Sequence, residues 1–284
     1  MMASKPDRTT ASSDRELILV GYQEELLELA TLAAEDAGRK LLKLFRSSRV
    51  SIKRKYDYPG SIVTNADKQS EKIILAKIRR SGVKSRVVSE EAGTLNYGSS
   101  DITWAVDPLD GTLNYVKRIP YFAVSIGILF RRRTVAGVIY NPNLDEMFTA
   151  ARDKGAHLNG RRIHVSNARS LRNSSLIFEW WEAEPSILDP LALEKRLYRF
   201  TRSLRSPGSV ALNLCSVASG RFDGLATVFQ RSPIYETAAG CLIVQEAGGR
   251  ITDSSGKSWE GFSRSILAGG PPIHRQLLSL VRRH

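Results

Sequence analysis

Long hydrophobic runs are absent from this sequence. The longest, Tyr121–Phe130, is too short to cross a bilayer and is typical of a buried strand. The first residues carry scattered charges rather than a continuous apolar stretch, which does not fit a secretory signal. Only two cysteines occur, Cys215 and Cys241, and their spacing indicates neither a disulfide framework nor a zinc site. We therefore expect a cytoplasmic protein without a membrane span.

Acidic residues are in the minority, since 42 Lys and Arg stand against 29 Asp and Glu and give a formal net charge of +13. Such a charge can attract phosphate esters or nucleic acids. The basic residues, however, form short clusters far apart in the sequence with no aromatic residues between them, such as Lys53–Lys55 and Arg131–Arg133. We favour a solvated basic surface and do not expect nucleic acid to be the partner.

The length of 284 residues and the hydrophobic fraction of 42% are enough for one large domain or two tightly fused lobes. Residues 1–15 are polar and lack periodicity, so we predict a disordered tail there. A change of pattern near Ala168 divides the rest into an N-terminal α+β lobe, residues 16–168, and a C-terminal α/β lobe, residues 169–284.

Hydrophobic periodicity predicts the elements of both lobes. Apolar residues three and four apart indicate a helix over residues 22–46, and a second helix runs from Asn65 or Asp67 to Arg80. From Arg86 onward, short apolar segments indicate strands, with Arg131–Arg133 at a hairpin tip. The second half alternates strands and helices. The sequence therefore predicts a mixed α+β fold.

Acidic residues gather where predicted strands end. Glu90 and Glu91 follow one strand, Asp107 and Asp110 follow another, and Asp67 lies at the start of a helix. Like charges held close together in a partly dry cleft are unfavourable unless cations neutralise them. The four histidines lie outside these segments. Oxygen ligands without histidine or thiolate favour magnesium, manganese or calcium over zinc.

The order of residues in the segment Asp107–Thr112 predicts a particular backbone geometry. Pro108 cannot continue a strand, so we expect a sharp turn that aims both carboxylates and the Leu109 carbonyl at one region. Gly111 lets the backbone approach a ligand closely, and Thr112 begins a short helix with free N–H groups. Metals at the carboxylates and N–H donors beside them would make a phosphate site.

Five segments in this order resemble the inositol monophosphatase superfamily of metal-dependent phosphatases. They are Ile62–Asp67, Ser89–Glu91, Trp104–Tyr115, Gly208–Leu214 and Tyr235–Gly240. They span most of the chain, and the third is highly specific. The resemblance implies a layered α/β/α/β/α sandwich, usually a homodimer, that hydrolyses phosphate monoesters.

The resemblance also implies two to three magnesium ions, with manganese as a substitute. Glu90, Asp107 and the Leu109 carbonyl would hold the first ion, and Asp107, Asp110 and Glu236 the second. Glu90 would help with a weaker third. Two metals roughly 4 Å apart can neutralise the phosphate and activate water without a covalent nucleophile.

Catalysis and substrate binding are assigned in the same way. Thr112 and Asp67 would orient and deprotonate the attacking water, with Glu90 as a further catalytic residue. The substrate-binding residues that the resemblance and the loop chemistry point to are Asp110, Gly111, Thr112, Gly208, Ser209, Val210 and Arg231.

Two departures leave the substrate open. Glu236 stands where the family normally has Asp, which keeps the charge but adds a methylene, so activity or metal preference can change. The loop containing Arg231 lacks the acid that contacts the inositol ring in typical members and is similar to that of archaeal members, which also act on fructose bisphosphate. Arg231 either meets a second phosphate or is a solvated loop residue.

The candidate functions are therefore ranked but not reduced to one. The first is a magnesium-dependent phosphatase of inositol 1-phosphate, fructose 1,6-bisphosphate or both. A nucleotide phosphatase acting on NADP or adenosine bisphosphate is the alternative within the family. A degenerate site in a binding or regulatory protein, or a nucleic-acid-binding module that uses the +13 surface, is the alternative outside catalysis.

Overall fold

The structure is a computed structural model that describes residues 10–47, 51–54, 62–180, 189–229, 233–259, 261 and 263–282, with side chains from residue 22 onward. Two large sheets and one short hairpin organise these residues. The hairpin pairs β1 (Ile52–Arg54) with β2 (Ile62–Thr64) and leads directly into the second helix.

The larger sheet has eight strands in the spatial order β10-β9-β8-β7-β6-β5-β3-β4. Its strands are β3 (Arg86–Ser89), β4 (Gly93–Asn96), β5 (Ile102–Asp110), β6 (Ala123–Phe130), β7 (Arg133–Asn141), β8 (Glu146–Ala151), β9 (Gly155–Leu158) and β10 (Arg161–Arg162). Neighbours in this sheet pair antiparallel except β3 and β5, which are parallel. The carboxyl ends of β3 and β5 therefore lie side by side, since Ser89 is opposite Val106.

The smaller sheet has five strands in the order β12-β11-β13-β15-β14. Its strands are β11 (Ser175–Trp180), β12 (Ser203–Arg205), β13 (Gly224–Val228), β14 (Arg250–Thr252) and β15 (Ser265–Gly269). The first three in space, β12, β11 and β13, are parallel, and β15 pairs antiparallel with β13 and β14. A short 3₁₀ helix, η1 (Leu171–Asn173), precedes β11.

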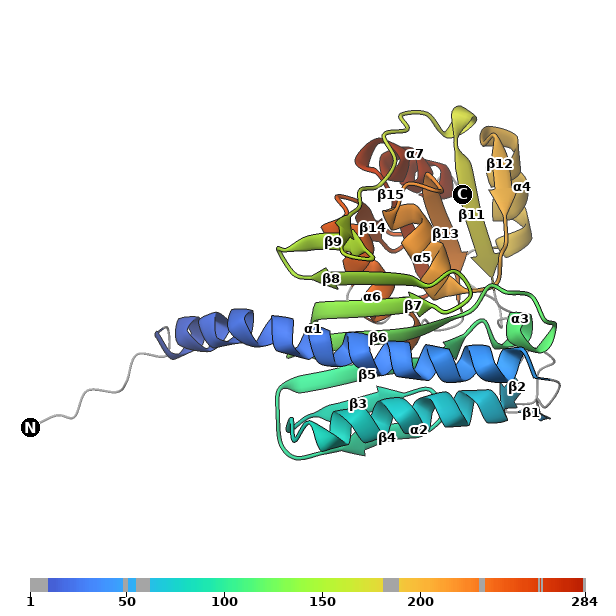
Figure 1. Ribbon diagram of the computed structural model, residues 1–284. Coiled ribbons are helices and arrows are strands. Elements are labelled where there is room, and N and C mark those ends of the chain that lie inside the picture. Colours follow the sequence, from blue (N-terminus) through green and yellow to red (C-terminus); the bar gives the residue numbers. More distant parts are fainter. Residues whose placement is uncertain are drawn as a thin grey trace, which may run out of the picture.

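Helices form three layers around the two sheets. They are α1 (Thr10–Phe45), α2 (Asn65–Arg80), α3 (Thr112–Val116), α4 (Pro190–Phe200), α5 (Val210–Ala218), α6 (Ile234–Glu246) and α7 (Pro271–Arg282). The pair α1 and α2 covers one face of the larger sheet, while α5 and α6 lie between the sheets (Figure 1). Helix α7 packs on the smaller sheet, beside α4. The predicted α/β/α/β/α sandwich is confirmed.

Small residues bring the middle layer close to the larger sheet. A Cβ at Gly137 of β7 would lie 2.8 Å from the Ala239 Cα of α6, and one at Gly127 of β6 would lie 2.8 Å from the Ala238 Cβ. Only glycine fits on the strands at this separation, so α6 rests almost directly on the backbone of β6 and β7. Because α6 begins close to β6, its first turn, which holds Glu236, lies near Ser125 of β6 and Asp107 of β5.

The structure differs from the sequence expectations at both ends of the chain. Helix α1 begins at Thr10 rather than at residue 22, so residues 10–15 are helical instead of belonging to a disordered tail; residues 1–9 lie outside the described part. Strand β15 and helix α7 follow β14 and were not foreseen. No described helix combines the length and the apolar character that crossing a membrane requires.

The expected sharp turn at Pro108 is wrong, since β5 continues to Asp110. Asp107 is opposite Ser125 and Asp110 is opposite Ala123, so β5 has one residue more than β6 in this stretch. This is a β-bulge, which accommodates a proline because the extra residue leaves the regular ladder. The strand therefore continues through Pro108, and the bulge changes the direction of the side chains between Asp107 and Asp110.

Candidate active site

The parallel pair β3 and β5 brings the first two carboxyl groups together. Glu90 follows β3 directly, and its N–H donates to the carbonyl of Val106 at 3.1 Å. Asp107 is the next residue of β5, is only 1% exposed, and shares a side-chain hydrogen bond with Glu90. Burial, followed by the charges of Glu90, Asp110 and Glu236, raises the pKa of Asp107 well above its usual value. Two ionised carboxyl groups this close repel each other, so the pair favours a cation beside it.

The bulge is held by contacts from both sides. The Leu109 N–H donates to Asp107 Oδ1 at 3.0 Å, and the Ser70 hydroxyl of α2 donates to the Pro108 carbonyl at 2.6 Å. The Leu109 side chain is fully buried, whereas its carbonyl accepts a hydrogen bond from the Thr112 hydroxyl at 3.0 Å. The side chain therefore anchors the bulge in the core, and the carbonyl faces the polar side.

Asp110 joins the two halves of the chain. Its Oδ2 accepts hydrogen bonds from the Ser209 hydroxyl and from the Ala211 N–H, the latter at 3.0 Å. Both donors lie at the N-terminus of α5, where backbone N–H groups lack intrahelical partners. Burial raises the pKa of Asp110 to about 7, and the bonds from Ser209 and Ala211 oppose that rise.

Asp67 and Thr112 meet although 45 residues separate them. Asp67 is the third residue of α2 and closes a capping box with Thr64, whose N–H donates to Asp67 Oδ2 at 2.8 Å. Its other oxygen, Oδ1, lies 3.2 Å from the Thr112 hydroxyl. Burial raises the pKa of Asp67 to about 7, against the lowering effect of the Thr64 bonds. A carboxyl group with this pKa can accept a proton near neutrality.

Gly111 and Gly208 bring two loops into contact. Gly111 has φ +87, and a Cβ there would lie 2.9 Å from the Tyr121 carbonyl oxygen and 3.3 Å from that of Gly208. The Asn114 amide binds the same region and donates to the carbonyls of Tyr121 at 2.9 Å and of Pro207 at 2.8 Å. Thus the start of α3 is tied to the loop that carries Gly208, Ser209 and Val210.

Glu236 completes the acidic group from the middle layer. It lies in the first turn of α6, where a negative side chain is favoured by the helix dipole. The neighbouring Tyr235 carbonyl lies 3.3 Å from the Ser125 hydroxyl of β6, and Ser125 is opposite Asp107 in the sheet. The charge of Glu236 raises the pKa of Asp107, so the two groups share one electrostatic environment.

The donor set fits a hard divalent cation in its chemistry. The candidate ligands are carboxylate and carbonyl oxygens, they are mostly buried, and their mutual repulsion calls for positive charge. As the side chains stand, no three His, Cys, Asp or Glu residues in the described part of the chain form a group able to hold a metal ion. The donor chemistry, carboxylate and carbonyl oxygens without histidine or thiolate, is nevertheless the one that magnesium prefers.

Two buried glutamates support this site and were missed by the sequence analysis. Glu71 accepts hydrogen bonds from the Ser89 hydroxyl and, at 2.8 Å, from the Ala92 N–H, so it braces the turn that carries Glu90. An acid on the buried face of α2, one turn before Ile74, was the available signal.

Glu179 is the second of these glutamates and follows three buried apolar residues in β11. It accepts hydrogen bonds from the Gly208 N–H and, at 2.7 Å, from the Asn213 amide. Asn213 in turn accepts from the Tyr121 hydroxyl at 2.9 Å. Burial raises the pKa of Glu179. An acid in an apolar strand could have been flagged, but not its partners.

The structure brings together all of the predicted site residues that it describes. Arg231 lies outside the described residues. The others converge where β3, β5, α2, α3, α5 and α6 meet. They are Asp67, Glu90, Asp107, Leu109, Asp110, Gly111, Thr112, Gly208, Ser209, Val210 and Glu236.

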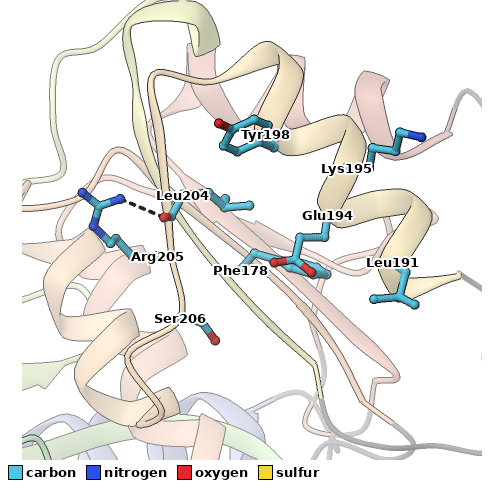
Figure 2. Close-up of a pocket in the computed structure, with 8 residues that line it drawn as sticks. All are labelled: Phe178, Leu191, Glu194, Lys195, Tyr198, Leu204, Arg205 and Ser206. Carbon is cyan, nitrogen blue, oxygen red and sulfur yellow. Dashed lines mark hydrogen bonds between the residues drawn. The ribbon is translucent and has the colours of Figure 1, made fainter.

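A separate cavity of about 530 Å³ lies between α4 and the strands β11 and β12 (Figure 2). Tyr198 and Leu191 reach it from α4, and Phe178 reaches it from β11. Phe178 precedes Glu179 in the strand, so the two side chains point to opposite faces of the sheet. The cavity is therefore on the far side of β11 from the acidic group.

Comparison with known proteins gives consistent matches. The model of the inositol monophosphatase family matches residues 22–284. Nus factor SuhB of Escherichia coli strain K12 is 35% identical, over 90% of this chain and 96% of its own. Inositol monophosphatase 2 of Solanum lycopersicum is 37% identical, over 86% and 93% respectively. The solved structure of extragenic suppressor protein suhB from Bartonella henselae has a TM-score of 0.83 at 33% identity, and the match covers 91% of this chain and 99% of that one.

Proposed function

This chain belongs to the inositol monophosphatase family, and we propose that it is a magnesium-dependent phosphatase of small phosphorylated polyols or sugars. The observation that carries the proposal is the meeting of Asp67 and Thr112 beside the carboxyl groups at the ends of β3 and β5. A hydroxyl and a proton acceptor beside a group of carboxyl oxygens support the proposal. Hydrolysis of a phosphate monoester by water needs these components.

The ligands proposed for magnesium are Glu90, Asp107, the Leu109 carbonyl, Asp110 and Glu236. Bound magnesium would neutralise the phosphate oxygens and lower the pKa of the attacking water. The chain's own contribution is a set of fixed oxygens. Asp110 is held by Ser209 and Ala211, and the Leu109 carbonyl by the bulge, so little side-chain order has to be created when substrate binds.

Proton transfer is assigned to Thr112 and Asp67. The Thr112 hydroxyl has one proton and two acceptors within reach, the Leu109 carbonyl and Asp67 Oδ1. With the Leu109 carbonyl bound to magnesium, that proton would be directed to Asp67, and the hydroxyl oxygen lone pair could then accept a hydrogen bond from water. As that water attacks, its proton passes to Thr112 Oγ1 and the Thr112 proton to Asp67 Oδ1. The raised pKa of Asp67, about 7, suits a base of this kind. Glu90 is proposed as a further catalytic residue.

Substrate would lie between the start of α3 and the start of α5. The N–H groups of Gly111 and Thr112 are proposed to bind the phosphate, and Asp110 and the loop from Gly208 to Val210 the polyol. Inositol 1-phosphate is the first substrate to try, since the tomato relative is named an inositol monophosphatase. Fructose 1,6-bisphosphate is the second, with Arg231 as the proposed contact for its second phosphate. NADP and adenosine bisphosphate are the nucleotide alternatives. A homodimer and a cytoplasmic location stay predictions.

The experiment is a phosphate-release panel with these substrates, each with magnesium and with EDTA. We expect magnesium-dependent release that falls at least a thousandfold in Asp107→Asn and is retained in Asp101→Asn, an exposed acid at the other end of β5. Absence of release above the Asp107→Asn background on every substrate would count against catalysis. It would favour the hypothesis of a degenerate site in a binding or regulatory protein. Restoration of turnover in Glu236→Asp would then identify Glu236 as the cause.

A further inference from the structure

A second cavity, of about 500 Å³, lies at the opposite end of the larger sheet. Arginines of the β6–β7 turn, Arg152 after β8, the C-terminal half of α6 and Trp259 line it. In the sheet, Asp107 is opposite Ser125, and Phe130 at the turn is five residues further along β6. At about 3.3 Å per residue this separates the cavity from Asp107 by roughly 17 Å. The cavity is therefore not part of the phosphatase site.

Positive charge at this cavity is only partly neutralised. Arg131 pairs with Asp101 through its Nε at 2.9 Å. Arg133 is exposed, and no carboxylate in the described ranges pairs with it. Arg152 is half-buried and donates from Nε to the Thr134 carbonyl at 2.8 Å. A guanidinium bonded through Nε keeps its two terminal nitrogens as donors for a further acceptor.

The charges that face Arg152 act in both directions. Burial and the charge of Arg133 lower its pKa, and Glu246 and Asp153 oppose them by smaller amounts. The Glu246 carboxylate is itself occupied, because it accepts the N–H groups of Asp153 at 3.0 Å and of Gly155 at 2.9 Å. Two neighbouring guanidinium groups that repel each other are stabilised by an anion that binds both.

The turn that presents these arginines is conformationally unfavourable. It is a two-residue turn between the paired residues Phe130 and Arg133, with φ 49 at Arg131 and φ 79 at Arg132. Asn and Gly are the residues that such a turn favours, and an arginine in this conformation costs about 1 kcal/mol or more. Strain kept at a charged cavity is typical of a functional position.

The lining also includes apolar side chains. Leu242 of α6 and Trp259 contribute to it, with the Gln245 amide beside them. The Trp259 ring packs partly against the core, and its Nε1 is buried without a hydrogen-bond partner among the described residues. A lining that combines guanidinium groups with an aromatic and an aliphatic side chain suits a ligand that has both phosphates and a flat apolar body.

We propose that this cavity binds a small anion bearing more than one phosphate group, with Arg133 and Arg152 as its phosphate contacts. The volume of about 500 Å³ lies within the range of small-ligand sites and accepts a nucleoside polyphosphate. Inorganic polyphosphate has the same charged part without the base. The base would lie against Trp259 and Leu242.

The test is equilibrium binding of ATP and of inorganic tripolyphosphate to the full chain by calorimetry, in EDTA at low salt. EDTA keeps divalent cations out of the acidic site, where phosphate esters would otherwise bind. Arg133→Gln and Arg152→Gln are each expected to weaken binding at least tenfold, because each removes a charge-assisted hydrogen bond. Arg172→Gln, an exposed arginine beside β11, is the matched control and is expected to stay within twofold of the parent.

The outcomes separate the two ligands and can overturn the site. Tighter binding of ATP than of tripolyphosphate, lost in Trp259→Leu, assigns a nucleotide; equal affinities assign inorganic polyphosphate. Absence of binding at millimolar concentration, or affinities that Arg133→Gln and Arg152→Gln leave unchanged, would overturn the proposal. Arg133 is exposed, so its variant carries the test alone if Arg152→Gln does not fold.

Discussion

Replacing Gly111 with alanine should destabilise the protein in two ways at once. Gly111 has φ +87, a left-handed conformation that costs an L-residue about 1–2 kcal/mol. The added Cβ would also lie 2.9 Å from the Tyr121 carbonyl oxygen and 3.3 Å from that of Gly208. Both are backbone atoms, so relief requires movement of the segment that precedes β6 or of the Gly208 loop. Overpacking of this kind costs about 1–3 kcal/mol.

Gly82 supplies the matched control. It has φ +72 just after the end of α2, and nothing lies within 4 Å of the Cβ that alanine would add. Gly82→Ala should therefore lose only the conformational part, about 1 kcal/mol. Gly111→Ala should lose about 3 kcal/mol in total, and the difference of about 2 kcal/mol measures the close approach of the two loops.

Thermal unfolding followed by circular dichroism is the assay. At about 2–4 °C per kcal/mol for a chain of this size, Gly111→Ala should melt about 4–8 °C below Gly82→Ala. It should also release less phosphate at temperatures where it is folded, because the two loops that enclose the proposed substrate are displaced. Equal melting temperatures for the two variants would refute the close approach of Gly111 to the Gly208 loop.

Three further predictions follow from other contacts. In EDTA, the free energy of unfolding should fall as pH rises from about 4 to about 7, because the pKa of Asp67 is about 7 in the folded chain and near 3.8 in the unfolded chain. Denaturant titrations of Asp67→Asn should show a smaller fall over the same pH range. Glu179→Gln should raise the KM for substrate more than it lowers kcat, because it loosens the Gly208 loop rather than removing a reacting group; an unchanged KM would contradict this. Replacing Arg131–Arg132 by Asn-Gly should raise the melting temperature by about 2–4 °C, since the strain of the turn exceeds the exposed Arg131–Asp101 pair; a lower melting temperature would contradict it.

The local chemistry of the site was readable from the sequence. A strand ending in carboxylates predicts a place where cations are needed, whatever the rest of the chain does. Periodicity predicted the helix up to Arg80 and the hairpin tip at Arg131–Arg133, and both are confirmed. The family resemblance supplied the layered sandwich, which is confirmed, and the roles of the site residues, which stay predictions.

The expectation at Pro108 failed because the answer depends on a neighbouring strand. A proline ends a strand when it removes a hydrogen bond that the ladder needs, and only the register with β6 shows that a bulge makes that bond unnecessary. The helical start at Thr10 was missed for a different reason: the polar composition of residues 10–15 is also typical of a disordered tail.

What the sequence by itself determined is which side chains carry charge and where strands and helices place them along the chain. Only the tertiary structure decided which of them meet. Asp67 reaches Thr112 from 45 residues away, and Glu179 reaches Gly208 from 29 residues away. Such partners are chosen by the parallel pairing of β3 with β5 and by the packing of α5 and α6 between the sheets. Periodicity describes each element alone, whereas the distance between two elements depends on every layer packed between them.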